Sequence, residues 1–329
     1  MNATNFGTQM LSGLYGRIDT FRRSKSRMNI ILVVIAALIF ICMSIFVPRF
    51  FTVNNLMNIL VQTSSVGLLT LGITFVLITG GMDLSLPSIM AASAVIGASY
   101  MKQGGSPVVG ALVMVIISVG CGAVNGLAVS KAKMIPFVVT LSTMVLGSGL
   151  AVWYTKAESI SSLPSGYIDV LTGRIGPIPV PAIILIVFAV IAHIVLSKTI
   201  YGRWVYATGI NERTARVSGI PTSGVLLSVY MVSGLFAGLA AVVLTARLGS
   251  ASASMGGDTL VMDVISSAVI GGVSIYGGLG TIPGAVFGSL FITIISNSMN
   301  LLGITYYTTL MIKGLVIVLV TALDTLRTR

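Results

Sequence analysis

The sequence predicts an all-α integral membrane protein with about ten transmembrane helices, within a range of eight to ten, packed closely through glycine. Hydrophobic residues make up 55% of the 329 residues and charged residues only 8%, whereas a soluble chain carries about 25% charged residues. The mean hydropathy is +1.03. The 37 glycines suit helices whose backbones approach each other in lipid. This composition excludes a soluble protein.

Apolar runs along the chain give the predicted spans. A helix needs about 20 apolar residues to cross roughly 30 Å of hydrocarbon. The first run follows a basic segment, as in a signal peptide, but it ends at Pro48 and Arg49 without a small-residue cleavage site, so it is predicted to stay as the first span. The runs cover residues 28–47, 56–79, 86–101, 107–130, 136–154, 180–197, 222–246, 259–273, 281–298 and 306–323.

The formal net charge of +11 predicts how the spans are oriented. Alternating them from a cytoplasmic N-terminus puts 13 of the 19 Lys and Arg residues on the cytoplasmic side, as the positive-inside rule requires. Both termini are then cytoplasmic, with residues 1–27 as a basic N-terminal segment and residues 324–329 as a short tail. Topology and contact with membrane lipid explain the charge, so no nucleic-acid partner is expected.

No linker divides the chain, so residues 28–323 are predicted to form a single transmembrane domain. Its inner connection, residues 198–221, holds most of the polar chemistry of the cytoplasmic side. Small residues recur four apart within spans, which places them on one helix face where another backbone can approach. We expect such helix packing at Gly234, Gly238, Gly280, Gly284 and Gly288.

Two acids interrupt apolar stretches, and two interpretations of each stay open. Asp83 lies in a predicted turn, with Ser85 as the N-cap of the next helix. It either binds a solute or ion or, as we favour, lies at the membrane surface and stabilises the helix start. Asp263 lies inside its run, where a lone carboxylate costs several kcal/mol. It either pairs with Lys313 or faces a cavity, or both charges extend separately to the interface.

Uncharged polar residues in other spans suit a pathway for a neutral, hydroxylated solute, which needs hydrogen-bond partners but no opposite charge. The candidate pathway residues are Asp83, Asn125, Thr140, Asp263 and Asn297. The alternative is that such side chains hold helices together. Two cysteines, one histidine and scattered acids form neither a metal-ligand set nor a catalytic cluster, so neither a metal site nor an enzyme is expected.

Residues 211–219 predict a short capped helix on the cytoplasmic side. Asn211 can cap its first turn, where the negative charge of Glu212 is favourable. Arg216 approaches its C-terminus, and Gly219 suits the left-handed position that ends it. A helix this short is not stable alone in water. Docking onto another protein explains it best, through apolar side chains expected to be available for contact, Ala215 and Val217.

Four segments resemble the permease subunits of bacterial ribose-type ABC sugar importers. The family's cytoplasmic coupling loop is similar to residues 202–220, GRWVYATGINERTARVSGI, and its Gly-Gly-hydrophobic-Asp-Leu-Ser turn is similar to residues 80–85, GGMDLS. Residues 269–288 and 54–60 are also similar, in order and at suitable spacing. The resemblance covers nearly the whole chain from about residue 50 onward.

The resemblance implies a type II-like ABC importer permease in the bacterial inner membrane. In this family two permeases, identical or related, form the pathway, two cytoplasmic ATPase subunits dock on the coupling loops, and a periplasmic binding protein delivers the sugar. Asp83 and Asp263 are implied to lie near the translocation interface. The residues implied to contact the ATPase are Glu212, Arg213, Ala215, Arg216 and Gly219.

The predicted function is the permease subunit of an ATP-driven importer for a small neutral sugar or related polyol. The sequence contains no Gly-x-x-x-x-Gly-Lys-Ser/Thr segment, so ATP and Mg are expected on the partner ATPase and no cofactor on this chain. The alternative is a stand-alone ion-coupled secondary transporter that uses Asp83 or Asp263. The chain departs from the family pattern at two places. Leu86-Pro87 in place of Val-Gly leaves the entry of the helix at Pro87 open, and Met262 in place of an acid leaves the substrate or coupling chemistry of Asp263 open.

Overall fold

The computed structural model describes residues 40–41, 43–45, 47–257, 259–315 and 318. The predicted N-terminal segment 1–27, the tail 324–329 and most of the first predicted span lie outside these residues. The chain forms two units, Met1–Phe50 and Phe51–Arg329. In the described part of the first unit, residues 40–41 and 43–45 are helical, and everything below concerns the second unit.

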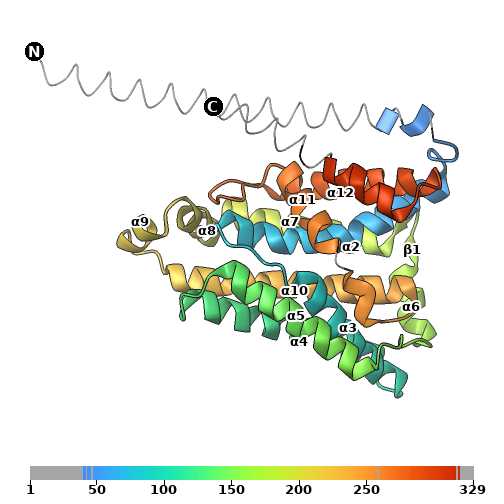
Figure 1. Cartoon of the computed structure of the whole chain (residues 1–329), viewed down its shortest axis with the longest axis horizontal. Helices are drawn as coiled ribbons and strands as arrows, with labels where there is room; N and C mark the ends of the chain where they lie inside the picture. Colours follow the sequence, from blue (N-terminus) through green and yellow to red (C-terminus); the bar gives the residue numbers. More distant parts are fainter. Residues whose placement is uncertain (1–39, 42, 46, 258, 316–317, 319–329) are drawn as a thin grey trace, which may run out of the picture. The chain divides into compact units, whose positions relative to one another are not determined.

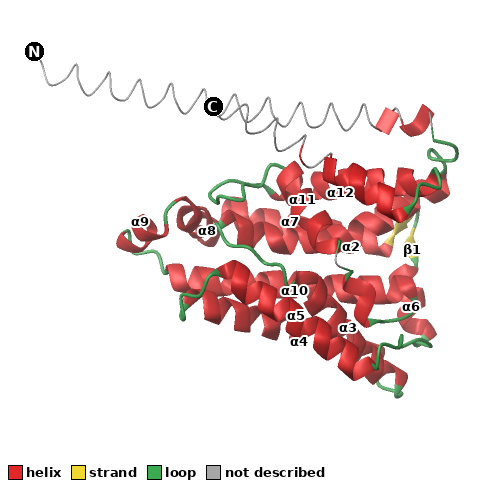
Figure 2. Ribbon diagram, in the orientation of Figure 1, coloured by secondary structure: helices red, strands yellow, loops and turns green. Residues whose placement is uncertain are grey.

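The second unit is helical, with one short two-stranded sheet (Figure 2). Residues 306–315 are also helical. The elements are α2 (Val53–Ile78), α3 (Leu86–Lys102), α4 (Pro107–Ser130), α5 (Pro136–Thr155), α6 (Ser165–Thr172), β1 (Arg174–Ile175), β2 (Ile178–Pro179), α7 (Val180–Lys198), α8 (Ile200–Ile210), α9 (Glu212–Val217), α10 (Thr222–Leu248), the 3₁₀ helix η1 (Ala253–Gly256), α11 (Leu260–Ile270) and α12 (Ile282–Leu301).

The predicted spans from 56–79 to 281–298 each correspond to one of these helices, with boundaries that differ by at most three residues. Seven helical segments of the described chain are long and apolar enough to cross a membrane. One of them, Ala253–Ile270, is the broken segment made of η1 and α11. The helix α3 has 17 residues and is shorter than these seven. A multi-pass membrane protein is therefore confirmed, and the number of eight to ten spans stays a prediction.

The helices α2 and α10 lie at the centre of the bundle. The helix α10 packs against α4 on one side and α2 on the other, and α11, α12 and α7 pack against α2 (Figure 1). The helix α3 packs against α4, α5 and α10. The residues of α2 are therefore almost all buried from Thr63 to Ile78. The helices α8 and α9 lie at one end of this unit, and α6 with β1 lies at the other (Figure 1).

Glycines bring α4 and α10 into backbone contact. A Cβ atom at Gly234 would lie 2.2 Å from the carbonyl oxygen of Ser118, and one at Gly238 would lie 2.6 Å from the Cα atom of Val115. Gly122 of α4 faces the α10 backbone in the same way, at 2.3 Å. Because distances under 3.0 Å leave no room for a side chain, only glycine permits this approach.

The second predicted glycine face, on α12, contains Gly284 and Gly288 but not Gly280. A Cβ atom at Gly284 would lie 2.1 Å from the carbonyl oxygen of Gly271, and one at Gly288 would lie 1.9 Å from that of Ser267, so α12 packs tightly on α11. Gly280 precedes the helix, and the expectation that it shares this face is wrong. The helix starts later because a threonine side chain at position 281 caps it.

Candidate functional site

The turn between α2 and α3 places Asp83 in the interior of the bundle. One oxygen of its carboxylate accepts hydrogen bonds from the backbone nitrogen of Ser85, at 3.0 Å, and from the Ser85 hydroxyl. The other oxygen accepts from the hydroxyl of Ser233, at 2.7 Å. Only 1% of Asp83 is exposed. Neutral donors surround this carboxylate, and none of the ion pairs among the described residues includes it.

Helices α3, α4, α5 and α10 meet around this carboxylate. Asn125 of α4 donates to the Ser85 hydroxyl at 2.9 Å and accepts from Thr143 of α5 at 2.6 Å. In the same turn, the carbonyl of Met82 accepts from the hydroxyl of Tyr230 at 3.2 Å. Apart from Ser85, the partners come from distant parts of the sequence, on α4, α5 and α10, so tertiary contacts hold the turn. We call the following residues the Asp83 network: Asp83, Ser85, Asn125, Thr143 and Ser233.

The favoured expectation for Asp83, a position at the membrane surface, is wrong. Its partner Ser233 lies near the middle of α10, a helix of 27 residues. Ser85 does occupy the N-cap position of α3, but its side chain makes no cap bond because its hydroxyl is used by Asp83. Asn125 and Thr140 are fully buried, so in this conformation these polar groups join helices and do not line an open pathway.

Asn297, another predicted pathway residue, also joins two helices. Its side-chain amide and that of Asn55 on α2 exchange two hydrogen bonds, each 3.0 Å long. Both residues are buried. The geometry is that of interhelical adhesion by paired amides, which the sequence had left as the alternative.

A second helix break lies next to the first. The chain leaves α10, forms the short helix η1, and begins α11 at Leu260. A Cβ atom at Gly256 would lie 2.4 Å from the carbonyl oxygen of Pro87, so the chain before α11 touches the start of α3. Broken helices that meet in the interior of a membrane protein leave backbone groups free for ligands, and such breaks mark binding sites in many transporters.

Asp263 lines a cavity of about 330 Å³ beside this second break, which we call the polar cavity. In its wall the Lys313 ammonium donates to both oxygens of the Asp263 carboxylate, at 2.9 and 2.8 Å. Both side chains are largely buried. The ion pair that the sequence left open is therefore present. The polar residues that line the cavity are Gln62, Ser65, Arg247, Thr259, Asp263, Thr293, Ser296 and Lys313.

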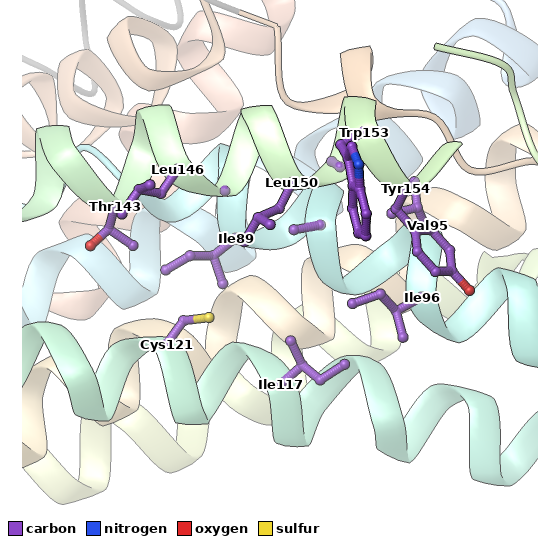
Figure 3. A pocket seen from close by; sticks show the side chains of 13 residues that line it. Ile89, Val95, Ile96, Ile117, Cys121, Thr143, Leu146, Leu150, Trp153 and Tyr154 are labelled. Carbon is purple, nitrogen blue, oxygen red and sulfur yellow. The ribbon is translucent and has the colours of Figure 1, made fainter. Parts of the chain in front are cut away.

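Two further spaces border α3 and α5. One, of about 250 Å³, lies against η1 and shares the lining residue Gly257 with the polar cavity. The other, of about 270 Å³, is an apolar cleft among α3, α4 and α5. Figure 3 shows Ile96, Ile117 and Leu150 around this cleft. Its lining is almost entirely carbon, so it offers a hydroxylated solute few hydrogen-bond partners.

The inner connection forms two helices, and the predicted short helix is present as α9. The side chain of Asn211 accepts a hydrogen bond from the backbone nitrogen of Thr214 at 2.9 Å, which is the expected cap. Glu212 lies in the first turn and Arg216 in the last. Gly219 has a φ of +82°, a conformation that favours glycine and ends the helix.

The exposed side of α9 differs in one residue from the prediction. Ala215 is only 4% exposed, and the expectation that it is available for contact is wrong because it faces the rest of the chain. Arg213 and Gly219 are exposed, and Val217 is 90% exposed. Ile210, at the end of α8, is 73% exposed. Ile210 and Val217 are therefore two exposed apolar side chains beside the charged residues of α9.

Glu212 links α9 to the connection between α4 and α5. Its carboxylate forms ion pairs with Lys133, at 3.2 Å, and with Arg216. Partial burial opposes ionisation of Glu212, but the hydrogen bonds and charges of the two cations outweigh it and hold the pKa of this carboxyl below its usual value. The groups are substantially exposed, so the stabilisation is modest. Lys133 and α9 thus lie at the same end of the bundle.

Backbone contacts join α8 to the end of α2. A Cβ atom at Gly209 would lie 1.8 Å from the carbonyl oxygen of Ile78, and that oxygen accepts a hydrogen bond from the backbone nitrogen of Gly278 at 2.8 Å. A Cβ atom at Gly277 would lie 2.7 Å from the carbonyl oxygen of Gly209. We call Gly209, Gly277 and Gly278 the glycine junction. It connects the inner loop to the turn that carries Asp83 and to the segment after α11.

Sequence reasoning missed three residues that the structure makes important. Ser233 and Thr143 belong to the Asp83 network, and Ser65 lines the polar cavity. Isolated hydroxyl residues within apolar spans carry no local signal, because most of them bond to their own helix. The only usable sign was the run of polar residues around Ser65 in an apolar span.

Long apolar helices, two interior helix breaks and polar cavities beside them define a multi-pass membrane transport protein. Among the residues that the structure describes, no group of three or more His, Cys, Asp or Glu residues can hold a metal ion. The chain belongs to the family described as branched-chain amino acid transport system / permease component, whose model matches residues 55–321.

Relatives of this chain are named for sugars. It is 39% identical over 287 residues to the ribose import permease protein of Bacillus subtilis, which covers 86% of this chain and 88% of the relative. It is 35% identical over 296 residues to the D-allose transport system permease protein of Escherichia coli, with 89% and 90% covered. The galactose/methyl galactoside import permease protein of Haemophilus influenzae is 30% identical over 302 residues, with 85% and 89% covered. No solved structure matches the chain.

The resemblance seen in residues 80–85 and 202–220 is thereby confirmed at the level of the family. The family description mentions amino acids, whereas these three relatives are named for the import or transport of monosaccharides. Such permeases are transport subunits, so transport is the activity to explain.

Proposed function

We propose that the chain is the permease subunit of an ATP-driven ABC importer for a small neutral sugar or related polyol. The observation that carries the proposal is the 39% identity to a ribose import permease over 86% of this chain. Polar cavities lined by hydroxyl, amide and paired charged groups support a hydroxylated solute. The proposal includes a single transmembrane domain over residues 28–323 of eight to ten spans, with a type II-like arrangement.

The proposed partner proteins would bind at the two opposite ends of the helix bundle. The end that carries α9 presents Arg213 and Val217 on a helix too short to be stable alone, with Ile210 beside them at the end of α8. A cytoplasmic ATPase that binds ATP and Mg would dock there. A periplasmic sugar-binding protein would deliver solute at the opposite end. A second permease, identical or related, would complete the pathway. This places the chain in the bacterial inner membrane, surrounded by lipid.

Positive charge supports the orientation. Lys131 and Lys133 lie between α4 and α5, and the ion pair of Lys133 with Glu212 puts this connection at the α9 end. Further basic residues of the inner loop, Arg203, Arg213 and Arg216, lie at the same end. Basic loops face the cytoplasm, which supports a cytoplasmic position for α9. We propose the same side for both termini, because the predicted spans alternate across the membrane.

The glycine junction supports a route from ATP hydrolysis to the pathway. Movement of α8 and α9 by the ATPase would press on Ile78 at the end of α2 and on Gly278 after α11, because the backbones touch there. Both contacts lead to helix breaks, one at Asp83 and the other before Leu260. Closure of the ATPase would thus be transmitted to the breaks without a nucleotide site on this chain.

The docking proposal is tested with Arg213→Glu in the complex purified from membranes. Arg213 is exposed and makes none of the ion pairs among the described residues, so its reversal disturbs the chain less than a change at Arg216. We expect at least tenfold loss of ATPase subunit recovered with the permease and a matching loss of ATP-dependent D-ribose uptake. The matched control is Arg174→Glu, an exposed residue at the opposite end. Unchanged recovery of the ATPase with Arg213→Glu would contradict the docking site.

A further inference from the structure

The connection between α11 and α12 exposes apolar side chains at the end of the bundle that carries α8 and α9 (Figure 1). Tyr276 is 95% exposed, the largest exposed fraction among its neighbours in this connection. Ile275 and Leu279 are exposed as well, at 40% and 42%. Residues 271–280 contain no charged residue. The connection therefore offers an uncharged, largely apolar surface with an aromatic ring at its centre.

Ile210 of α8 extends this surface. A Cβ atom at Gly278 would lie 2.8 Å from the Ile210 side chain, and Ile210 is 73% exposed. We call the following residues the apolar tip: Ile210, Ile275, Tyr276 and Leu279. Adjacent apolar side chains that stay exposed indicate an interaction site. The core of a protein interface is enriched in tyrosine and poor in charge, and the apolar tip has that composition.

The turn that carries the apolar tip is anchored to two helices. The backbone nitrogen of Gly278 donates to the carbonyl of Ile78, the last residue of α2, at 2.8 Å. The hydroxyl of Tyr206 on α8 donates to the carbonyl of Gly280 at 2.7 Å. A surface that is already ordered loses little conformational entropy when a partner binds. The backbone below the Tyr276 ring is therefore suited to binding and to transmitting force.

The position of the turn favours a protein partner over lipid headgroups. Tyrosine is also common where membrane helices meet water, but such residues lie on the lipid-facing side of a bundle. The turn instead covers the end of α2, which lies at the centre of the bundle and is almost entirely buried from Thr63 to Ile78. The charged residues Glu212 and Arg213 of α9 lie at the same end. An apolar centre with charged residues around it is the usual arrangement of a protein interface.

We propose that the apolar tip is a second docking surface for the ATPase subunit, beside α9, with the Tyr276 ring as its central contact. The inference rests on the proposed function, which puts the ATPase at α9, and adds a contact outside the inner connection 198–221. The turn is continuous with α11 and α12, whereas the first surface belongs to α8 and α9. An ATPase bound to both surfaces would therefore act on two separate parts of the bundle.

Photocrosslinking tests whether the ATPase covers the apolar tip. A benzophenone amino acid replaces Tyr276, Val217 or Tyr307 in three separate variants of the complex purified from membranes. Val217 of α9, 90% exposed, is the positive control. Tyr307, 74% exposed, is the matched negative control, because the 20 residues of α12 carry the chain about 30 Å away from the turn. We expect crosslinks to the ATPase subunit, identified by mass spectrometry, from positions 276 and 217 and not from 307.

Truncation of the ring gives a second measurement. Tyr276→Ala removes an exposed side chain, so the Tm of the purified chain should not change, while the ATPase should bind the permease in nanodiscs at least tenfold more weakly. Tyr276→Phe keeps the ring, and Tyr307→Ala is the surface control. Both should bind the ATPase within threefold of the unsubstituted chain.

Three results would overturn the second surface and leave the proposed function intact. They are crosslinks to the ATPase from position 217 but not from 276, crosslinks from 276 to lipid alone, and unchanged ATPase binding by Tyr276→Ala. A purified complex that contains no ATPase subunit would instead overturn the proposed function.

Discussion

Asp83 and Asp263 are both acids within the helix bundle, but their charges are compensated in different ways. Asp83 lies in a turn between two helices and accepts hydrogen bonds from Ser85 and Ser233, which are neutral. Asp263 lies in the first turn of α11 and pairs with the Lys313 ammonium. Asp83 is only 1% exposed and lines none of the three spaces described above, although Thr143 of its network borders the apolar cleft, whereas the ion pair borders the polar cavity.

We infer from this difference in charge compensation that the two acids have different roles. A carboxylate held by several neutral donors from separate helices fixes the geometry of the helix break. All of its hydrogen bonds form only when the helices keep one arrangement. An ion pair at the wall of a cavity can exchange partners with a solute or with water. We therefore expect the Asp83 side of the bundle to act as a fixed frame and the Asp263 side, which borders a cavity, to be the side that can rearrange.

Removal of the Asp83 carboxylate is expected to have the largest effect. Asp83→Ala leaves the Ser85 and Ser233 donors buried without an acceptor, at a cost on the order of 3 kcal/mol in the free energy of unfolding. We expect an apparent Tm lower by about 5 °C or more, measured on the purified chain in detergent. The matched control is Asp169→Ala, an exposed acid on α6, which should leave Tm unchanged. A stable Asp83→Ala chain would show that the network is not the frame of the bundle.

A change at the glycine junction should uncouple the two activities of the complex. In Gly209→Ala the added Cβ would lie 1.8 Å from the carbonyl oxygen of Ile78, so α8 must move away from α2. We expect uptake to fall at least tenfold while the associated ATPase continues to hydrolyse ATP. The control is Gly224→Ala in α10, where a Cβ meets no atom within 4 Å. Equal uptake by both variants would remove the junction from the route of transmission.

Neutralising Asp263 should have the smallest effect of the three. Asp263→Asn keeps a hydrogen-bonding side chain at the cavity wall but leaves Lys313 without its partner, so a fall in uptake of a few fold is expected. The exchange of both charges, Asp263→Lys with Lys313→Asp, should restore part of the loss. Complete loss of uptake by Asp263→Asn in a normally assembled complex would favour the alternative, an ion-coupled secondary transporter with Asp263 as its coupling site.

The sequence predicts the features that depend on neighbouring residues. The span 107–130 was predicted with the same boundaries as α4, because Pro107 starts the helix and the apolar run ends at a lysine. The cap of α9 by Asn211 and its end at Gly219 were also predictable, since capping uses residues within one turn.

Long-range contacts could not be predicted in this way. Ser233 lies 150 positions from Asp83 along the chain, and no local pattern indicates that the two side chains meet. For the same reason the surface position favoured for Asp83 was wrong, although the turn itself was predicted. The pairing of Asn55 with Asn297 spans 242 positions. These contacts depend on how the helices pack in three dimensions. The spacing of residues within one helix carries no information about them.

The central claim is that this chain moves solute with energy from a partner's ATP, and the energy source of uptake tests it most directly. The permease, its ATPase and its binding protein are purified and reconstituted in proteoliposomes, and uptake of radiolabelled D-ribose, D-allose and D-galactose is measured. The account predicts uptake of at least one of these sugars that requires ATP and the ATPase and that persists when ionophores abolish proton and sodium gradients. Uptake by the chain alone, driven by an ion gradient and independent of ATP, would contradict it.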